Sequence, residues 1–411
     1  MSLEEKIERD LDLLSRGTED IINVDDLRKK ITRYHQTGQP MVVKEGFDPS
    51  APDIHLGHTV TLRKLRQFQD LGHQVVFLIG DFTGRIGDPT GKKNTRKQLN
   101  EEEVLKNAQT YSDQAFKILD RDKTVIKFNS TWLKDITFAD LVVITSHFTV
   151  ARMMEREDFA KRLAAGKPVG LHEFLYPIMQ AYDSVALRAD VELGGTDQRF
   201  NLLMGRDMQR EYDQEPQVVM MMPLLEGTDG VEKMSKSLDN YIGVHDLPFE
   251  MFGKVMSIPD HIVEKYFILL TDVPIEDVQS LARKVRTNEL HPMKWKKQLA
   301  REIVTIYHGP AAAEKTSEEF DKTFSKKENP EDALSLAISR GELKDGKMWV
   351  VQLLLKTGMC TSKSEIRRLI EQGGVYLDGE RISDFNTDLS LPDGTFLRVG
   401  KKSFFRITLV G

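Results

Sequence analysis

Two short groups of residues that can stabilise negative charge stand about 175 positions apart in the chain. The first is the run HLGH, from His55 to His58, and the second is the run KMSKS, which contains Lys233 and Lys236. Imidazole and ammonium groups without a base–nucleophile pair suit the binding of a polyphosphate. Taken alone, the first run could equally be two surface histidines at a helix start, and the second could be a solvated loop.

The histidines are expected at the turn from a strand into a helix. An apolar run at 41–43 predicts the strand, and apolar residues at helical spacing from Leu62 to Leu71 predict a helix that ends at Gly72. Such a turn points backbone N–H groups and the positive end of the helix dipole at whatever lies above it, which suits an anion. Gly57 has no side chain to keep a nucleotide away from the backbone.

From position 41 to about position 222 the sequence alternates strand and helix patterns. This alternation predicts an α/β region with a largely parallel sheet and helices on both faces. Ligands of such folds bind beyond the carboxyl ends of the strands. The predicted strands are Met41–Val43, Val75–Ile79, Thr124–Phe128, Val191–Leu193 and Val218–Met222.

Two loops at these strand ends carry residues suited to a nucleotide or an amino acid. After the second strand, Asp88 could bind an ammonium group, and Lys92 and Arg96 could bind phosphate. The alternative for this loop is a mobile, solvated surface segment. After the fourth strand, Thr196 and Asp197 predict a Thr/Asp cap at the start of a helix. Gly194 leaves room for a sugar or purine and Asp197 could bind ribose hydroxyls; the alternative is an ordinary strand-to-helix turn.

One predicted helix turns three polar side chains to the same side. Tyr176, Gln180 and Asp183 are four and three residues apart on an otherwise apolar helix. A carboxylate on such a surface needs a partner, because an unpaired buried charge is costly. Asp183 must therefore find a partner, unless it is a helix-end carboxylate in water.

The composition indicates a globular protein of two or three domains. The 411 residues are too many for one core, and a net charge of −6 means that a nucleic-acid partner must meet local basic patches. Cys360 is the only cysteine, which excludes an internal disulfide framework and a cysteine zinc cluster and suits a reducing compartment. A charged start and the lack of a long apolar run indicate a cytoplasmic protein.

The remainder of the chain predicts a helical region and a separate C-terminal unit. Basic residues flank Trp295 in the helical region, where they could serve an RNA backbone or simply form a solvated face. A polar stretch at 325–330 predicts a linker. In the tail, a capping box at 362–365 starts a basic helix, and 375–379 predicts a strand with a hairpin turn, a combination that fits an RNA-binding module.

The HLGH and KMSKS runs, in this order and at this spacing on an α/β chain, resemble the two signatures of class I aminoacyl-tRNA synthetases. The further residues make the whole chain similar to the bacterial-type tyrosyl-tRNA synthetases, and its tail similar to the S-four-type RNA-binding domain of those enzymes. The resemblance implies N-terminal helices with a Rossmann-like parallel-sheet catalytic domain at 1–238. It further implies a helical anticodon-binding domain at 239–332 and a small α+β RNA-binding domain at 346–411.

The resemblance also implies a reaction and its participants. L-tyrosine and ATP would give tyrosyl-adenylate, and the tyrosine would then be transferred to the 3′ end of tRNA(Tyr). The implied enzyme is a cytoplasmic homodimer that uses ATP with Mg²⁺ and needs neither zinc nor a membrane.

The site residues carried over by the resemblance fall into four groups. The implied catalytic residues are His55, His58, Lys233, Lys236, Lys92 and Arg96. The implied ATP-binding residues are Ser50, His55, Gly57, His58, Thr61, Gly194, Asp197 and Lys236. The implied tyrosine-binding residues are Asp48, Asp88, Tyr176, Gln180, Asp183 and Gln198, with Asp183 on the phenol. The implied RNA-binding residues are Lys363, Arg367 and Arg368.

One position departs from the family pattern. Many members carry a tyrosine two residues before the Gly-Phe-Asp-Pro run as a second partner for the substrate phenol, whereas this chain has Lys44. Two alternatives stay open: a tryptophanyl enzyme, which shares the fold and both signatures, and a non-catalytic RNA-binding protein on the same scaffold. A dinucleotide-dependent dehydrogenase is disfavoured, because no G-x-G-x-x-G follows the first strand.

Overall fold

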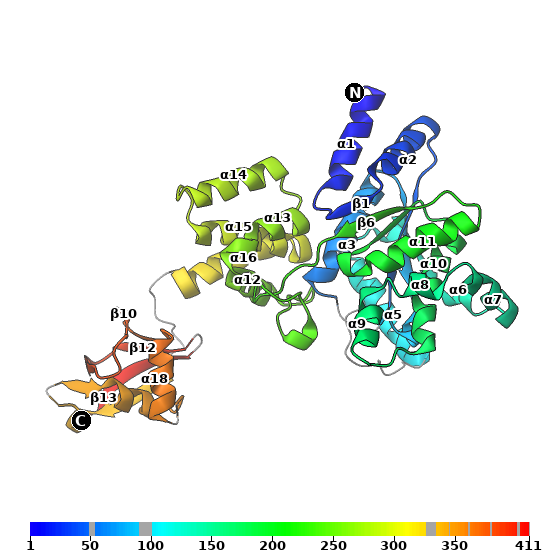
Figure 1. The fold of residues 1–411 in the computed structure, drawn as a ribbon. Helices are drawn as coiled ribbons and strands as arrows, with labels where there is room; N and C mark the ends of the chain where they lie inside the picture. Colours follow the sequence, from blue (N-terminus) through cyan, green and yellow to red (C-terminus); the bar gives the residue numbers. More distant parts are fainter. Residues whose placement is uncertain are drawn as a thin grey trace. The chain divides into compact units, whose positions relative to one another are not determined.

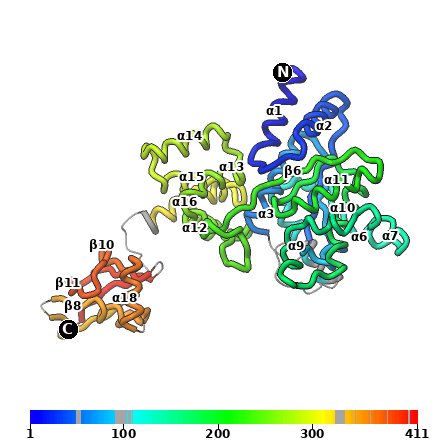
Figure 2. The backbone as a smooth tube through the Cα atoms, in the orientation of Figure 1, coloured from blue at the N-terminus to red at the C-terminus, as the bar shows by residue number. Residues whose placement is uncertain are grey.

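The computed structural model describes residues 1–48, 54–89, 101–325, 334–344, 346–360, 362–378, 380–400 and 403–410. The chain divides into two compact units, 1–314 and 315–411 (Figure 1). The boundary falls inside helix α16 (Pro310–Phe320), in the yellow part of the trace in Figure 2. The finer division at residue 238 remains a prediction.

The first unit is built on a six-stranded sheet in the order β1-β6-β5-β2-β3-β4. All neighbours are parallel except β1, which pairs antiparallel with β6 at one edge. The five predicted strands are confirmed, although the first runs further than expected, and the three-residue edge strand β1 was not predicted. The strands are β1 (Asp20–Ile22), β2 (Val42–Phe47), β3 (Gln74–Ile79), β4 (Thr124–Phe128), β5 (Val191–Gly195) and β6 (Val218–Met222).

Strand β2 lies between β3 and β5. The chain adds β3 and β4 on one side of β2 and then crosses over to add β5 and β6 on the other side. In an open parallel sheet this reversal opens a crevice at the carboxyl ends of the two strands, where ligands bind. The middle of the sheet is buried, since Val43 and Val191 are fully inaccessible and every residue of β6 is at most 3% exposed, whereas the edge strand β4 has exposed residues. Because β2 to β6 run parallel, their carboxyl ends all lie at one edge of the sheet.

Helices connect these strands and continue beyond the last one. Helix α3 packs against β2, β3 and β5, and α11 packs against β5 and β6. Among the helices of the described ranges, none has both the length and the apolar character required to cross a lipid bilayer. The helices up to β6 are α1 (Leu3–Ser15), α2 (Val24–Thr37), α3 (Leu56–Asp70), α4 (Thr83–Ile86), α5 (Glu101–Ala115), α6 (Ser130–Leu133), α7 (Phe138–Ser146), α8 (Val150–Met153), α9 (Glu157–Ala164), α10 (Leu171–Leu187) and α11 (Arg199–Glu211).

The predicted helical region is confirmed, but its aromatic residue does not serve RNA. Trp295 is only 5% exposed and stacks on Phe267 with ring centroids 6.0 Å apart, so it belongs to the core. The amphipathic spacing of α15 turns this ring inward, away from the lysines beside it. The helices are α12 (Pro248–Ser257), α13 (Val263–Leu270), α14 (Ile275–Arg286) and α15 (Pro292–His308).

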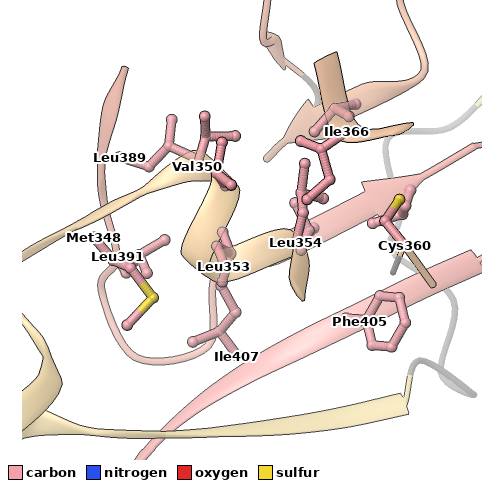
Figure 3. Close-up of a cluster of buried hydrophobic side chains, with 14 of the residues drawn as sticks. Met348, Val350, Leu353, Leu354, Cys360, Ile366, Leu389, Leu391, Phe405 and Ile407 are labelled. Atoms are coloured by element: carbon pink, nitrogen blue, oxygen red, sulfur yellow. The ribbon is translucent and has the colours of Figure 1, made fainter. Parts of the chain in front are cut away.

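The second unit is a small α+β fold. Its five-stranded sheet has the order β10-β9-β12-β13-β7, and β11 pairs with β8. Helices α17 (Val350–Lys356) and α18 (Lys363–Glu371) cover the sheet with a core that includes Leu354, Ile366 and Phe405 (Figure 3). Ser362 caps α18 by accepting a hydrogen bond from the Glu365 N–H at 3.2 Å. The strands are β7 (Leu334–Ser339), β8 (Lys347–Trp349), β9 (Val375–Leu377), β10 (Glu380–Arg381), β11 (Asp388–Ser390), β12 (Phe396–Val399) and β13 (Ser403–Val410).

Candidate active site

The two histidines of HLGH form the N-terminus of α3. His55 is the N-cap residue, and its Nδ1 accepts a hydrogen bond from the Gly57 N–H at 3.2 Å. The His55 N–H in turn donates to Nδ1 of His58 at 3.3 Å, and the two rings lie 3.9 Å apart between centroids. Because both Nδ1 atoms accept, the proton of each neutral ring is on Nε2. The turn therefore offers two fixed Nε2–H donors.

Both imidazoles are neutral at physiological pH. Burial is the main cause that lowers the pKa of His55, to about 2, followed by the nearby His58, Lys236 and Lys233. Burial also lowers the pKa of His58, to about 4, and the same two lysines add to the effect. The histidines therefore act as hydrogen-bond donors and carry no charge of their own.

The loop with the KMSKS run, residues 224–240 and hereafter the KMSKS loop, meets the HLGH turn. A β-carbon placed on Gly57 would lie 3.5 Å from Cβ of Met234. The segment after the loop also contacts the turn. The Leu56 N–H donates to the Ile242 carbonyl at 2.9 Å, and the backbones of His55 and Gly243 form an isolated antiparallel β-bridge. Two motifs remote in sequence thus share one side of the sheet.

Asp48 follows β2 and links the crevice to helix α10. Its Oδ2 accepts from the Tyr176 hydroxyl at 2.8 Å, and its Oδ1 accepts from the Thr83 hydroxyl at 2.9 Å. A β-carbon on Gly80 would overlap Oδ1, so only glycine allows the carboxylate to sit there. Burial and the Asp48 charge raise the pKa of Tyr176 well above its usual range, which keeps this phenol as a donor.

Asp183 has the partners that its buried position demands. It is 2% exposed, and it accepts from the Trp132 indole N–H at 2.8 Å and from the Asn129 amide at 3.2 Å. The same amide nitrogen of Asn129 also donates to the Thr83 hydroxyl at 3.0 Å, so the carboxylate joins the chain of contacts from Asp48. Burial raises the pKa of Asp183 to about 7, against the lowering effect of Lys44 and the two hydrogen bonds.

Lys44, the residue that departs from the family pattern, forms a buried ion pair. Its Nζ lies 2.8 Å from Oε1 of Glu192, its register partner on β5, and the two side chains are 0% and 1% exposed. Glu192 also accepts from Gln180 at 3.2 Å, from Ser184 at 3.1 Å and from Gln217. The pair is thus fully hydrogen-bonded on its acidic side, as a buried ion pair must be.

Asp88, at the end of the loop after β3, is bound on both oxygens. Arg156 donates to Oδ1 at 2.9 Å, and Gln198 donates to Oδ2 at 2.8 Å. Arg156 is itself only 4% exposed and also holds Asp158 and Asn201. Two side-chain donors therefore fix the position of this carboxylate.

Asp197 follows β5 and meets the KMSKS loop. Its Oδ2 lies 3.4 Å from Nζ of Lys233, an exposed pair. A β-carbon on Gly194 would touch Leu202 at 3.1 Å, which explains the glycine by helix packing as well as by ligand access. The predicted Thr/Asp helix cap is wrong: the chain enters α11 through the 3₁₀ turn Thr196–Gln198, and neither α11 nor the turn has a side-chain cap bond.

The remaining predicted residues lie in different places. Thr61 is 8% exposed, and its hydroxyl donates to the His58 carbonyl within α3. Ser50, Lys92 and Arg96 lie outside the described residues. Among the described residues no group of three or more His, Cys, Asp or Glu side chains could hold a metal ion.

Sequence reasoning missed four residues that complete the crevice. Asn129 follows β4, so the rule that ligands meet the carboxyl ends of strands could have found it. The other three residues have no local sequence signal, because each contacts a residue more than fifty positions away in the chain. They are Trp132, Arg156 and Glu192.

The basic helix α18 of the second unit carries its cations over aromatic rings. Lys363 lies 5.4 Å from the centroid of the Trp349 ring, and Arg367 lies 5.0 Å from that of Phe385. The two rings pack edge to face at 5.7 Å. Arg368 lines a cavity of about 440 Å³ on the same unit. Cations beside aromatic rings suit the backbone and bases of RNA.

Comparison with known proteins gives concordant matches over both units. The family model described as "tRNA synthetases class I (W and Y)" matches residues 36–325, and the model described as "S4 domain" matches residues 348–391. A relative named tyrosine–tRNA ligase from Moorella thermoacetica is 53% identical over 405 residues, which cover 98% of this chain and 97% of the relative. A relative of the same name from Thermotoga maritima is 52% identical over 402 residues, which cover 98% of each chain.

Solved structures share the fold at low sequence identity. A tyrosyl-tRNA synthetase complexed with L-tyrosine from Archaeoglobus fulgidus has a TM-score of 0.60 at 22% identity, covering 76% of this chain and 99% of that one. A C-terminally truncated mitochondrial tyrosyl-tRNA synthetase from Aspergillus nidulans has a TM-score of 0.64 at 22% identity, covering 78% and 94%. At this identity the likeness concerns the fold alone.

Proposed function

The chain belongs to the class I tRNA synthetase family, and we propose that it activates L-tyrosine with ATP and transfers the tyrosine to tRNA(Tyr). The observation that carries the proposal is the meeting of the HLGH turn and the KMSKS loop, two motifs remote in sequence, at the N-terminus of α3. Full-length relatives that are about half identical and named for this reaction support it.

Activation demands alignment and positive charge more than acid–base chemistry. The tyrosine carboxylate attacks the α-phosphorus of ATP, a carboxyl–phosphorus bond forms, and the bond to pyrophosphate breaks without any proton transfer. His55 and His58 would donate their Nε2–H groups to phosphate oxygens, and Lys233 and Lys236 would meet the charge that develops on pyrophosphate. Mg²⁺ would enter as part of the ATP substrate and would supply positive charge to the phosphates, because no group of three or more His, Cys, Asp or Glu side chains among the described residues would hold it.

The neutral state of the histidines fits the lysines beside them. If His55 and His58 were protonated, their charges would repel Lys233 and Lys236. Neutral imidazoles can donate hydrogen bonds to phosphate at the same time as the ammonium groups bind it. Since both histidine pKa values lie at about 4 or below, this arrangement does not change between pH 6 and pH 9.

Tyrosine would lie along α10, with its phenol at Asp183. In the proposal Tyr176, Gln180, Asp88 and Gln198 surround the amine and carboxylate of the substrate, with Asp48 close by. Asp183 accepts one hydrogen bond on each oxygen and keeps a lone pair for the phenol hydroxyl. Phenylalanine would leave that buried carboxylate without its partner, which is the physical basis for rejecting it.

The second unit would bind tRNA through α18. The S4 domain match and the cation–aromatic pairs of Lys363 and Arg367 support this role. Deletion of residues 346–411 should leave tyrosine-dependent ATP–pyrophosphate exchange intact and weaken charging at limiting tRNA. Unimpaired charging under those conditions would refute the RNA role. We place the enzyme in the cytoplasm, where its substrates occur.

Exposed apolar side chains on α7 support a homodimer. Phe138, Val142 and Val143 on this helix are 82%, 52% and 57% exposed. Apolar side chains exposed together on one helix suit contact with a second copy of the chain. Sedimentation should give a dimer, and Phe138→Asp should shift it towards monomer; a wild-type monomer at micromolar concentration would contradict the assignment.

One assay decides between the amino acids. ATP–pyrophosphate exchange should depend on tyrosine and be undetectable with tryptophan at the same concentration. Exchange driven by tryptophan would favour the tryptophanyl alternative, and no exchange with any amino acid would favour a non-catalytic RNA-binding protein.

A further inference from the structure

Asn240 is the last residue of the KMSKS loop. Its side chain points back into the loop and contacts residues earlier in it. Its side chain is only 3% exposed, although its neighbours Ser237, Leu238 and Asp239 are exposed. A buried carboxamide must satisfy its donors and acceptor within the protein. The partners of Asn240 therefore show what the residue holds together.

The amide of Asn240 binds the backbone on both sides of Met234. Its Nδ2 donates to the carbonyl oxygens of Glu232 and Lys233, both at 3.3 Å. Its Oδ1 accepts from the Ser235 N–H at 2.8 Å. One rigid, planar group thus brackets the peptides that lie between the two lysines of KMSKS.

A carboxylate and a glycine hold the amide in this orientation. Asp229 Oδ2 accepts from Nδ2 at 2.6 Å, and Asp229 Oδ1 accepts from the N–H groups of Val231 and Glu232. A β-carbon on Gly227 would overlap the Asn240 carboxamide, so this position must remain glycine for the contact to exist.

The first arm of the loop is fixed to the helical region. The Tyr266 hydroxyl on α13 donates to the Glu226 carbonyl at 2.6 Å, and Lys265 donates to the Leu224 carbonyl at 2.9 Å. The second arm pairs with the first, since the Met234 N–H donates to the Leu225 carbonyl at 2.8 Å. Lys233 therefore lies next to the paired arms, which hold its backbone. Lys236 lies beyond the paired arms, in a turn between Ser235 and Asn240 that is closed by the hydrogen bond between these two residues.

We propose that Asn240 is a positioning residue for amino-acid activation, which sets the spacing between Lys233 and Lys236 and holds both over the HLGH turn. The inference rests on the proposed function, because it assigns a role to Asn240 in the same reaction. The residue acts through the two lysines and touches no reacting atom.

The test compares activation rate with tyrosine affinity in the full chain. Asn240→Ala removes all four side-chain contacts, and Asn240→Asp keeps the acceptor for Ser235 but sets a second carboxylate against Asp229. Each should lower kcat for tyrosine-dependent exchange about 10²-fold, the loss expected when charged groups are misplaced by about 1 Å. The tyrosine Kd should stay close to the wild-type value, because the four contacts of the Asn240 side chain all lie within the KMSKS loop.

Two further variants make the result specific. Gly227→Ala should reproduce the kcat loss, since its methyl group displaces the same carboxamide. Val231→Ala, at an exposed position of the same loop, should exchange at the wild-type rate. Wild-type kcat in Asn240→Ala would overturn the inference, and so would a loss that lies wholly in tyrosine affinity. Absence of exchange in the wild type would instead refute the proposed function.

Discussion

The two ends of the proposed tyrosyl-adenylate site use charge in opposite ways. At the phosphate end, the Lys233 side chain is 57% exposed and pairs with Asp197 at 3.4 Å. At the phenol end, Lys44 and Glu192 are at most 1% exposed and lie 2.8 Å apart. The lysine proposed to meet the triphosphate lies in water on a loop, whereas the lysine that acts on Asp183 is buried and ion-paired with Glu192.

This difference predicts which property each end controls. An exposed pair contributes little to stability, because water screens it. A buried pair is costly to break, because the remaining partner stays desolvated and unpaired. Substitutions at the phosphate end should therefore change rate, and substitutions at the phenol end should change selectivity and folding.

The largest expected effect is on selectivity at the phenol end. Asp183→Ala should abolish most of the preference for tyrosine over phenylalanine, measured as the ratio of kcat/KM values in ATP–pyrophosphate exchange. The known discrimination of about 10⁵ was established on a tyrosyl-tRNA synthetase itself, and it is the reference ceiling for this loss. Asp229→Ala, which lies in the KMSKS loop, should leave the ratio unchanged. An unaltered ratio in Asp183→Ala would exclude this carboxylate as the phenol partner.

The next effect is on rate at the phosphate end. Lys236→Ala should lower kcat for exchange about 10²- to 10³-fold with little change in the tyrosine KM, because the pyrophosphate charge develops only in the transition state. Melting temperature should stay near that of the wild type. A defect confined to tyrosine affinity would show that Lys236 belongs to the amino-acid subsite.

Breaking the ion pairs compares the two ends by stability. Lys44→Met should lower the free energy of unfolding by about 3–5 kcal/mol, since Glu192 loses its charged partner in a buried site. Asp197→Ala, which breaks the exposed pair with Lys233, should cost about 1 kcal/mol or less. Urea unfolding measures both. Equal losses of unfolding free energy in the two variants would contradict the claim that the buried Lys44–Glu192 pair costs more to break than the exposed pair.

The smallest effect is the pH dependence of tyrosine binding. With a pKa of about 7, Asp183 is ionised above pH 7 and accepts the phenol hydrogen bond, and it protonates below. Tyrosine affinity should therefore fall by up to about tenfold per pH unit below 7 and level off above it. Asp183→Asn should give a flat profile. A wild-type profile that is flat from pH 5.5 to pH 8.5 would contradict the role of this titration.

The same shift affects the stability of the ligand-free protein. The folded-state pKa is raised from a reference of 3.8, so the folded state binds more protons than the unfolded state between pH 3.8 and about pH 7. The contribution of Asp183 to the free energy of unfolding therefore decreases as pH rises through this window and is constant above it.

Sequence patterns predicted most of the sheet and part of the site. The apolar runs predicted all five parallel strands, because β2, β3, β5 and β6 are largely buried and are therefore apolar, and the edge strand β4 keeps an apolar run although two of its residues are exposed. Strand β1 escaped, since it has three half-buried residues at the edge of the sheet. The predicted Thr/Asp cap before α11 was wrong, because the chain continues through a 3₁₀ turn. The suggestion that Trp295 lies on the surface beside the lysines was also wrong, because the ring is buried in the core.

The sequence by itself determined the chemistry of the HLGH turn and the KMSKS loop, because turn geometry and helix ends depend on residues only a few positions apart. The tertiary structure alone decided which groups are charged and what each one holds. It brought Trp132 and Asn129 to Asp183 and paired Lys44 with Glu192. Protonation and pairing depend on burial by segments 50 to 150 residues away, and no local pattern in the chain encodes such distances.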